Sequence, residues 1–198
     1  MSAKERLQSL MRFDDCTSSK LITSRFQELA STLMGNFCVV RETETFCMTS
    51  LELYLYTSLS TLHQDPYTDR NPIQFSNGSW YVYLKGVKWS RLDITLGSEA
   101  QKLYGSLLIR AIDGVDGSAK SLRTIVRSGA TEVAPPWAWS EREKTFLNSI
   151  HNKNIWDSAL RLSEKPESSD ARIKLLPRVF TRPKGSPFDH VHLRAVLD

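Results

Sequence analysis

The sequence predicts a fold that combines helices with a β-sheet in one domain. Up to about Leu33, apolar residues recur at helical spacing, which predicts two short helices separated by the polar stretch DDCTSS. Beyond Gly35 the pattern changes to extended runs of alternating apolar and polar residues. A chain of 198 residues is long enough for one domain with a sizeable core. We therefore expect residues 1–34 to be an N-terminal helical segment packed on a domain formed by residues 35–198.

The extended runs define the strands of the predicted sheet. The segment FCVVRETETFCMTSLELYLY divides into two runs at a polar turn around Glu42 to Glu44. A polar loop that contains prolines begins at His63 and ends at Asn77–Gly78, a strong turn signal. The next three runs are WYVYLKG, RLDITLG and YGSLLIRAI, and the last is apolar enough to be buried on both faces.

The C-terminal half of the chain completes the predicted order of elements. Asp113 to Ser121 has the Gly, Asp and Ser content of a loop. Ser140 to Leu162 is predicted to be a helix, because Ser140 and Glu143 have the spacing of a capping box. From Ala171 onward, a final extended segment is interrupted by prolines.

Composition narrows the class of protein. Hydrophobic residues make up 40% and charged residues 24% of the chain, which excludes disordered, collagen-like and coiled-coil proteins. The net charge of +4 permits a phosphate-bearing partner without requiring one. No apolar run approaches the roughly 18 residues that span a bilayer, and the N-terminus lacks the apolar centre of a signal peptide. We expect a soluble intracellular protein, in the nucleus or cytoplasm, or in the nucleoid of a bacterium.

Three cysteines, Cys16, Cys38 and Cys47, include no C-x-x-C pair. Such spacing supports neither a zinc ribbon nor a disulfide framework. All three are therefore expected to be reduced core residues.

The run from Leu51 to Tyr56 carries the clearest functional signal. In a strand, alternate side chains point to opposite faces, so a leucine face lies opposite a face that carries Glu52, Tyr54 and Tyr56. A carboxylate desolvated between aromatic rings gains the elevated pKa of a general base. The next two runs repeat the split, with Tyr81, Tyr83 and Lys85, then Asp93 and Thr95, on the second face. This face is either a wall of rings and carboxylates for a flat ligand or a solvated surface.

The order of several motifs resembles a known family. The motifs are LELYLY, a loop with His63, Arg70–Asn71, GSWYVY and LLIRAI, with His63 eleven positions after Glu52. ELASTLMGNFCVVR precedes them and RPKGSPF follows, while Asp116 to Ala171 matches poorly. The set resembles the alkyladenine (3-methyladenine or alkylpurine) DNA glycosylases.

The resemblance implies an α+β fold and a base-excision activity. The fold is a single domain around a curved antiparallel sheet, like a formyltransferase C-terminal barrel, with N-terminal and peripheral helices. The implied activity flips a modified or damaged purine into an aromatic pocket and hydrolyses its N-glycosidic bond. Glu52 is then the general base, Tyr54, His63 and Tyr83 hold the base, and Arg110 holds the sugar-phosphate. No lysine nucleophile is present, so the strand stays intact. The resemblance further implies no cofactor, no metal, no membrane, and a monomer acting on DNA, or alternatively RNA or nucleotides.

Three departures from the family alter these expectations. The aromatic wedge before the glycine after Y-V-Y is replaced by Leu84–Lys85, and Lys85 suits a phosphate. Asp93 occupies the position of an asparagine that selects the base, so base choice changes. The loop adds Asp65 and Asp69, which repel phosphates. The compensating cations are expected to be Arg70, Lys85, Lys88, Arg91, Arg178, Arg182 and Lys184.

Two other functions remain open. A binding module on the same scaffold would recognise a modified base or nucleic acid without cutting it. A non-haem iron enzyme would use His63 and Asp65, with His190 or His192 as a further ligand. Glu52 separates the first alternative from the enzyme, because a binding module does not need a carboxylate among tyrosines.

Overall fold

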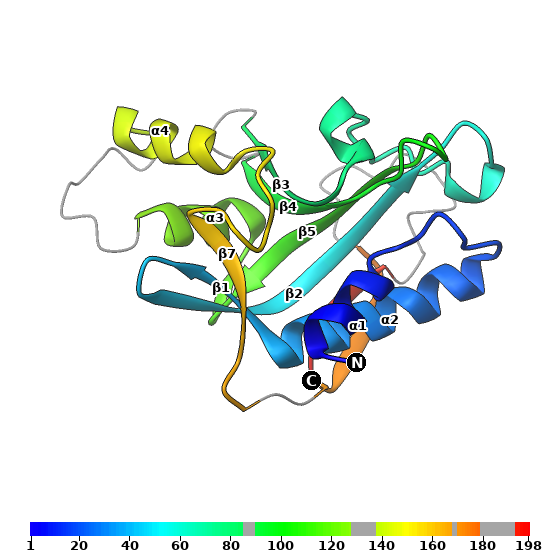
Figure 1. Cartoon of the computed structure of the whole chain (residues 1–198), viewed down its shortest axis with the longest axis horizontal. Helices are drawn as coiled ribbons and strands as arrows, with labels where there is room; N and C mark the ends of the chain where they lie inside the picture. The colour runs from blue at the N-terminus through cyan, green and yellow to red at the C-terminus, as the bar shows by residue number, and fades with distance from the viewer. Residues whose placement is uncertain (85–89, 128–137, 168–169, 179–192) are drawn as a thin grey trace.

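The computed structural model describes residues 1–84, 90–127, 138–167, 170–178 and 193–198. Helices pack against a curled antiparallel sheet that forms a half-barrel (Figure 1). The predicted α+β class with a curved antiparallel sheet is confirmed.

The described strands form one nine-stranded sheet, in which the path β3-β4-β5-β2-β1-β7 is extended by three short strands. Strand β6 pairs with β5, β9 pairs with β2, and β8 pairs with β9. The bounds are β1 Phe37–Arg41, β2 Glu44–Tyr56, β3 Asn77–Tyr83, β4 Arg91–Leu96, β5 Tyr104–Ile112, β6 Val115–Asp116, β7 Leu160–Glu164, β8 Ile173–Leu176 and β9 Arg194–Leu197. Strand β2 is therefore central, because β5 pairs with one edge while β1 and β9 share the other.

Two N-terminal helices, α1 (Ala3–Leu10) and α2 (Ser19–Asn36), begin at the serine N-caps Ser2 and Ser18. They pack together beneath β2 (Figure 1). Helix α2 buries Phe26, Leu29 and Leu33 in the same core as the sheet, so residues 1–34 share the core of the rest of the chain. Among the described residues, none of the helices has the length and apolar character needed to cross a bilayer.

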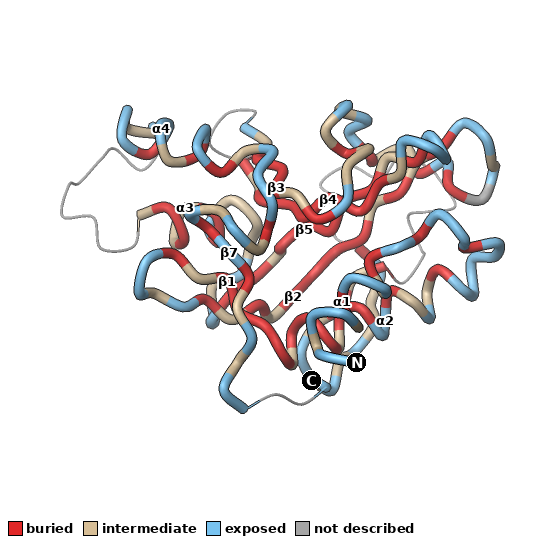
Figure 2. The backbone as a smooth tube through the Cα atoms, in the orientation of Figure 1, coloured by how far each residue is buried: buried red, intermediate tan, exposed pale blue. Residues whose placement is uncertain are grey.

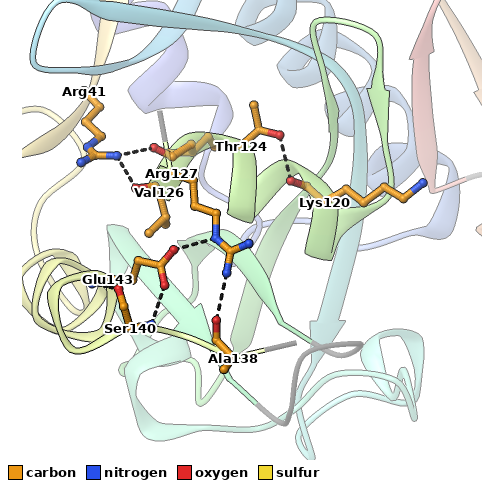
Figure 3. A network of polar contacts seen from close by, with 9 residues as sticks. Arg41, Lys120, Thr124, Val126, Arg127, Ala138, Ser140 and Glu143 are labelled. Atoms are coloured by element: carbon orange, nitrogen blue, oxygen red, sulfur yellow. Dashed lines mark hydrogen bonds and ion pairs between the residues drawn. The ribbon is translucent and has the colours of Figure 1, made fainter. Parts of the chain in front are cut away.

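Two further helices, α3 (Ser118–Arg127) and α4 (Glu141–Ile150), are joined by a network of polar contacts (Figure 3). The Arg127 Nε donates to Glu143 Oε1 at 2.6 Å, and its Nη2 donates to the Ala138 carbonyl at 2.9 Å. The Arg41 guanidinium donates to carbonyls of Ile125 and Val126 near the end of α3. Such contacts satisfy backbone groups that a helix terminus leaves unpaired.

Two secondary-structure predictions for this region are wrong. The loop predicted from Asp113 contains β6 and the start of α3, whose amphipathic pattern buries Leu122 and Ile125. The helix predicted to reach Leu162 ends at Ile150, although its Ser140–Glu143 capping box is confirmed. Asn152 adopts a left-handed conformation at φ 57°, and its N–H donates to the Trp80 carbonyl at 2.8 Å. Tertiary pairing with β3 thus overrides local helix propensity after the first ten residues.

The predicted leucine face is confirmed as core. Leu51, Leu53 and Leu55 belong to one apolar cluster with Ile94 and Leu107 on the neighbouring strands. Figure 2 shows β2, β4 and β5 buried along most of their length. The prediction that YGSLLIRAI is buried on both faces is also largely confirmed, because every residue of β5 except Tyr104 and Arg110 is buried.

In β2 and β5, the alternation of core-facing and outward-facing residues shifts by one position at the same place near one end of the strands. Met48 and Leu51 both lie in the core although three positions separate them, which strict alternation does not allow. The register shifts between Met48 and Ser50 and again between Ser50 and Leu51, and the partners Ile112 and Ile109 are likewise both in the core. This pair of irregularities turns Glu52 away from the core face that Met48 occupies.

Candidate functional site

One line of side chains crosses five strands on the face opposite the leucines. Register pairs place Tyr81 beside Asp93, Asp93 beside Leu108, Leu108 beside Glu52, and Glu52 beside Arg194. Directly opposed residues of neighbouring antiparallel strands point to the same face. We call these five residues the polar row.

The Glu52 carboxylate lies at the centre of the site and is 1% exposed. Its Oε2 accepts a hydrogen bond from the Tyr54 hydroxyl at 2.7 Å. Its Oε1 lies 3.6 Å from Arg110 Nε and 3.9 Å from Arg194 Nε. Burying a charge without partners is costly, and these three groups compensate for the loss of water. The arrangement therefore holds the carboxylate in a fixed orientation.

Tyr54 is held between Glu52 and an arginine from the C-terminal part of the chain. The Arg178 guanidinium lies 4.5 Å from the centre of the Tyr54 ring, within the range of a cation–π contact. Burial, together with the nearby Glu52 charge, raises the pKa of Tyr54 well above its ordinary value. The Tyr54 hydroxyl therefore keeps its proton and remains a donor to Glu52 throughout the neutral pH range.

Asp93, the second carboxylate of the polar row, is fully buried, as are Thr95 and Ser106 beside it. Burial raises the pKa of Asp93, and the Arg91 guanidinium, whose Nε lies 3.2 Å from Asp93 Oδ2, opposes that rise. Arg91 also lies 4.4 Å from the centre of the Tyr83 ring. The sequence predicted this arginine as a phosphate contact, and the structure pairs it with a carboxylate and a ring.

The acidic loop residues are also paired with protein groups. The Tyr81 hydroxyl donates to Asp69. Burial is the main cause that raises the pKa of Tyr81, and this hydrogen bond is the second. Arg70 has a left-handed backbone at φ 56° and places its guanidinium 4.9 Å from the centre of the Tyr56 ring. Arg70 therefore lies at the end of β2, and no contact joins it to Glu52 among the described residues.

His63 lines a separate pocket of about 530 Å³ on the leucine side of the sheet. The His63 carbonyl accepts from the Thr57 N–H at 3.0 Å. His63 therefore lies opposite Thr57, the next residue after Leu51, Leu53 and Leu55 in the alternation that forms the leucine face of β2. Phe13 and Leu103 of the core line the same pocket. Neither ring nitrogen has a hydrogen-bond partner within the described part of the chain, and burial lowers the pKa of His63. The structure thus does not bring His63 to Glu52.

The sequence identified most of the polar face but not all of its charges. The structure gathers Glu52, Tyr54, Tyr83, Asp93 and Arg110 on one face. Lys85, Arg182, His190 and His192 lie outside the described residues. Arg194 was missed, although alternation in the terminal run RAVL offers a signal once its pairing with β2 is known.

No set of three or more His, Cys, Asp or Glu side chains is placed to hold a metal ion among the described residues. Asp65, which the iron hypothesis requires, is instead bound by Arg178. No protein-family model matches the chain, and a search of curated proteins finds no significant match.

Proposed function

We propose that the protein is an N-glycosidic hydrolase that removes a modified or damaged purine, with Glu52 as its general base and DNA as its substrate. The observation that carries the proposal is the Glu52 carboxylate, which is buried on the polar face, fixed by Tyr54 and flanked by Arg110 and Arg194. The motif resemblance to alkyladenine DNA glycosylases supports the same assignment.

The surroundings of Glu52 suit this chemistry in two respects. A general base must be held in a fixed orientation, and the Tyr54 hydroxyl and two neighbouring guanidinium groups surround the Glu52 carboxylate. The same face carries aromatic rings, at Tyr54 and Tyr83, each beside the guanidinium group of an arginine. Rings and guanidinium planes are also the groups on which an unstacked base rests.

The reaction is a displacement by water at the sugar C1′ carbon. Water attacks C1′ as the bond from C1′ to the base nitrogen breaks, and Glu52 takes one proton from that water. The bond electrons leave with the base, which is released after it gains a proton, and a hydroxyl remains on C1′. No oxidant, reductant or cofactor enters this balance, and the phosphodiester bonds are untouched.

A second candidate function is a binding module that recognises a modified base or nucleotide without cutting it. The contacts of the site favour this alternative, because the Arg178 guanidinium and Glu52 already hold the Tyr54 side chain without any substrate. Glu52 also has three polar neighbours of its own, so its carboxylate has a structural role in the absence of any reaction.

Base release from defined DNA pools separates the two functions. Alkylated, deaminated and oxidised DNA, each single-stranded and duplex, is incubated with the wild type or with Glu52→Gln, and released bases are identified by mass spectrometry. Glu99→Gln is the matched control, because Glu99 is exposed on a loop away from the polar row. The proposal expects release by the wild type and by Glu99→Gln, and a loss of at least about 100-fold in Glu52→Gln.

Binding to the same oligonucleotides is measured in parallel, so that an absence of base release can be interpreted. Absence of release from every pool, with binding that survives Glu52→Gln, would overturn the enzyme and establish the binding module. Thermal melts of each variant confirm that the glutamine substitution leaves the fold intact.

A further inference from the structure

Cys38 and Cys47 face each other across the hairpin formed by β1 and β2. They are directly opposed in the strand register, and their Sγ atoms lie 2.8 Å apart. Both are free thiols in this structure. The contact was not expected from the sequence, because the spacing of the three cysteines does not match a metal or redox motif.

The hydrogen-bond pattern places this pair at the position where two strands approach most closely. The Lys165 N–H donates to the Asn36 carbonyl, next to β1. The even-numbered residues of β1, Cys38 among them, therefore direct their backbone N–H and C=O groups toward β7. The Cys47 N–H donates to the Asp113 carboxylate, and its carbonyl accepts from the Asp113 N–H. Cys38 and Cys47 are therefore a non-hydrogen-bonded pair, whose Cα separation of about 4.5 Å falls within the range a disulfide requires.

The pair lies on the outer face of the hairpin. Val39 and Phe46, the neighbours of Cys38 and Cys47 in sequence, point into the core cluster, which does not contain either cysteine of the pair. Cys47 is partly exposed, whereas Cys38 is 4% exposed. Cys16 and Cys38 are buried, so the expectation that the cysteines are core residues is confirmed for these two and is wrong for the partly exposed Cys47.

We propose that Cys38 and Cys47 form a redox-active dithiol that is oxidised to a cross-strand disulfide by a small-molecule disulfide such as glutathione disulfide. This site is independent of the proposed glycosidic activity, because it lies on a different part of β2 from Glu52. The resulting disulfide links the two strands near the β7 edge of the sheet.

The order of the two exchange steps follows from exposure. The more accessible Cys47 thiolate attacks the small disulfide, forms a mixed disulfide and releases one glutathione thiolate. The Cys38 thiolate then attacks Cys47 Sγ, forms the Cys38–Cys47 bond and releases the second glutathione. The protein loses two protons and two electrons, and one glutathione disulfide becomes two glutathione molecules. Burial and the Cys47 thiol raise the pKa of Cys38 to about 12, with Lys165 opposing and Asp113 reinforcing the rise, so the second step is slower.

Trypsin mapping tests the proposal, because Arg41 lies between the two cysteines. Cleavage places Cys38 in peptide 26–41, Cys47 in peptide 42–70 and Cys16 in peptide 13–20. The folded chain is incubated with mixtures of oxidised and reduced glutathione, alkylated and digested without reduction. The proposal expects peptides 26–41 and 42–70 to be joined, with Cys16 alkylated, and the link to disappear when reduced glutathione is added in excess.

Single variants and a matched control complete the test. Cys38→Ser and Cys47→Ser should each abolish the link, whereas Cys16→Ala should retain it. In Cys38→Ser, the remaining Cys47 should accumulate as a mixed disulfide with glutathione. Thiols that all remain alkylatable in the folded chain, or links that involve Cys16 or a second molecule, would overturn the proposal.

Discussion

Asp65 Oδ2 lies 2.6 Å from Arg178 Nη1, and neither side chain is more than 1% exposed. This buried ion pair joins the loop after β2 to the C-terminal part of the chain. The same Arg178 Nη1 donates to the Leu53 carbonyl at 3.0 Å, and its guanidinium covers the Tyr54 ring. The geometry of the residues around Glu52 therefore depends on a contact formed outside the polar row.

Removing the charge of Asp65 should destabilise the fold strongly. In Asp65→Asn, the Arg178 guanidinium remains buried without its carboxylate, which costs about 3–5 kcal/mol of unfolding free energy. Urea titration at pH 7 measures this loss. Glu141→Gln is the control, because its exposed ion pair with Lys144 is worth less than about 1 kcal/mol. Equal midpoints for the two variants would show that the buried pair contributes no more than a surface pair.

His63 should make the protein less stable in acid. Because burial lowers its folded-state pKa, the unfolded chain binds a proton at His63 more readily as pH falls below the ordinary value of 6.5. The stability associated with neutral His63 is present above that pH and declines as pH falls through the folded-state pKa. In His63→Leu this decline is absent. The difference in unfolding free energy between the variant and the wild type should therefore shift by about 1 kcal/mol in favour of the variant when the pH is lowered from 8 to 5.

Chemical denaturation of both proteins at several pH values provides the measurement. His151, whose pKa burial also lowers, is present in both proteins, so its contribution cancels. Two parallel curves of unfolding free energy against pH would contradict the assignment to His63.

The Cys38–Cys47 disulfide should raise the melting temperature of the folded chain. Closing a loop of about ten residues restricts the unfolded chain by about 3 kcal/mol in the loop-entropy description. For a chain of this length, the shift corresponds to roughly 6–12 °C. Differential scanning calorimetry of the oxidised and reduced wild type measures it. Cys47→Ser, treated with the same oxidant, should melt at the same temperature as its untreated form.

Glu143 should stabilise the protein only when it is ionised. Burial raises its pKa, but hydrogen bonds from the Ser140 N–H and hydroxyl and from Arg127 outweigh that effect, so the net pKa is lowered. Its contribution is present above the ordinary value of 4.5 and is lost as pH falls through the folded-state pKa. Glu143→Gln should cost about 1–2 kcal/mol at pH 7 and progressively less in acid.

The measurement is thermal unfolding of Glu143→Gln and of the wild type from pH 7 to pH 3. Exposed Glu99→Gln serves as control and should follow the wild type throughout. A cost that stays constant down to pH 3 would assign the effect of Glu143 to packing instead of charge.

The sequence predicted the two faces of the sheet because alternation in β2, β3 and β4 is a local property of each strand. Glu52, Tyr54 and Asp93 were placed on one face from that pattern alone, and the structure confirms their common face. The capping box at Ser140 was likewise predictable, because its residues are three positions apart.

The remaining features depend on contacts between distant segments. The pairing of Arg178 with Asp65 spans 113 positions, and no local pattern distinguishes it from a phosphate contact. His63 has family-like spacing from Glu52, but spacing along the chain does not fix the face to which a loop residue turns. The Cys38–Cys47 contact required the register of the hairpin, which follows from its two-residue turn at Glu42 and Thr43.

Because β2 and β5 carry matching irregularities, the number of residues in this region is more constrained than their identity. Deleting Thr49 would place Met48 and Leu51 two positions apart, so β2 would alternate regularly while β5 kept its own irregularity between Ile109 and Ile112, and the matched register of the two strands would be lost. A residue gained at the hairpin turn, by contrast, lengthens only an exposed tip. Insertions and deletions among distant relatives should therefore gather at Glu42 and Thr43 and avoid the interval from Phe46 to Glu52.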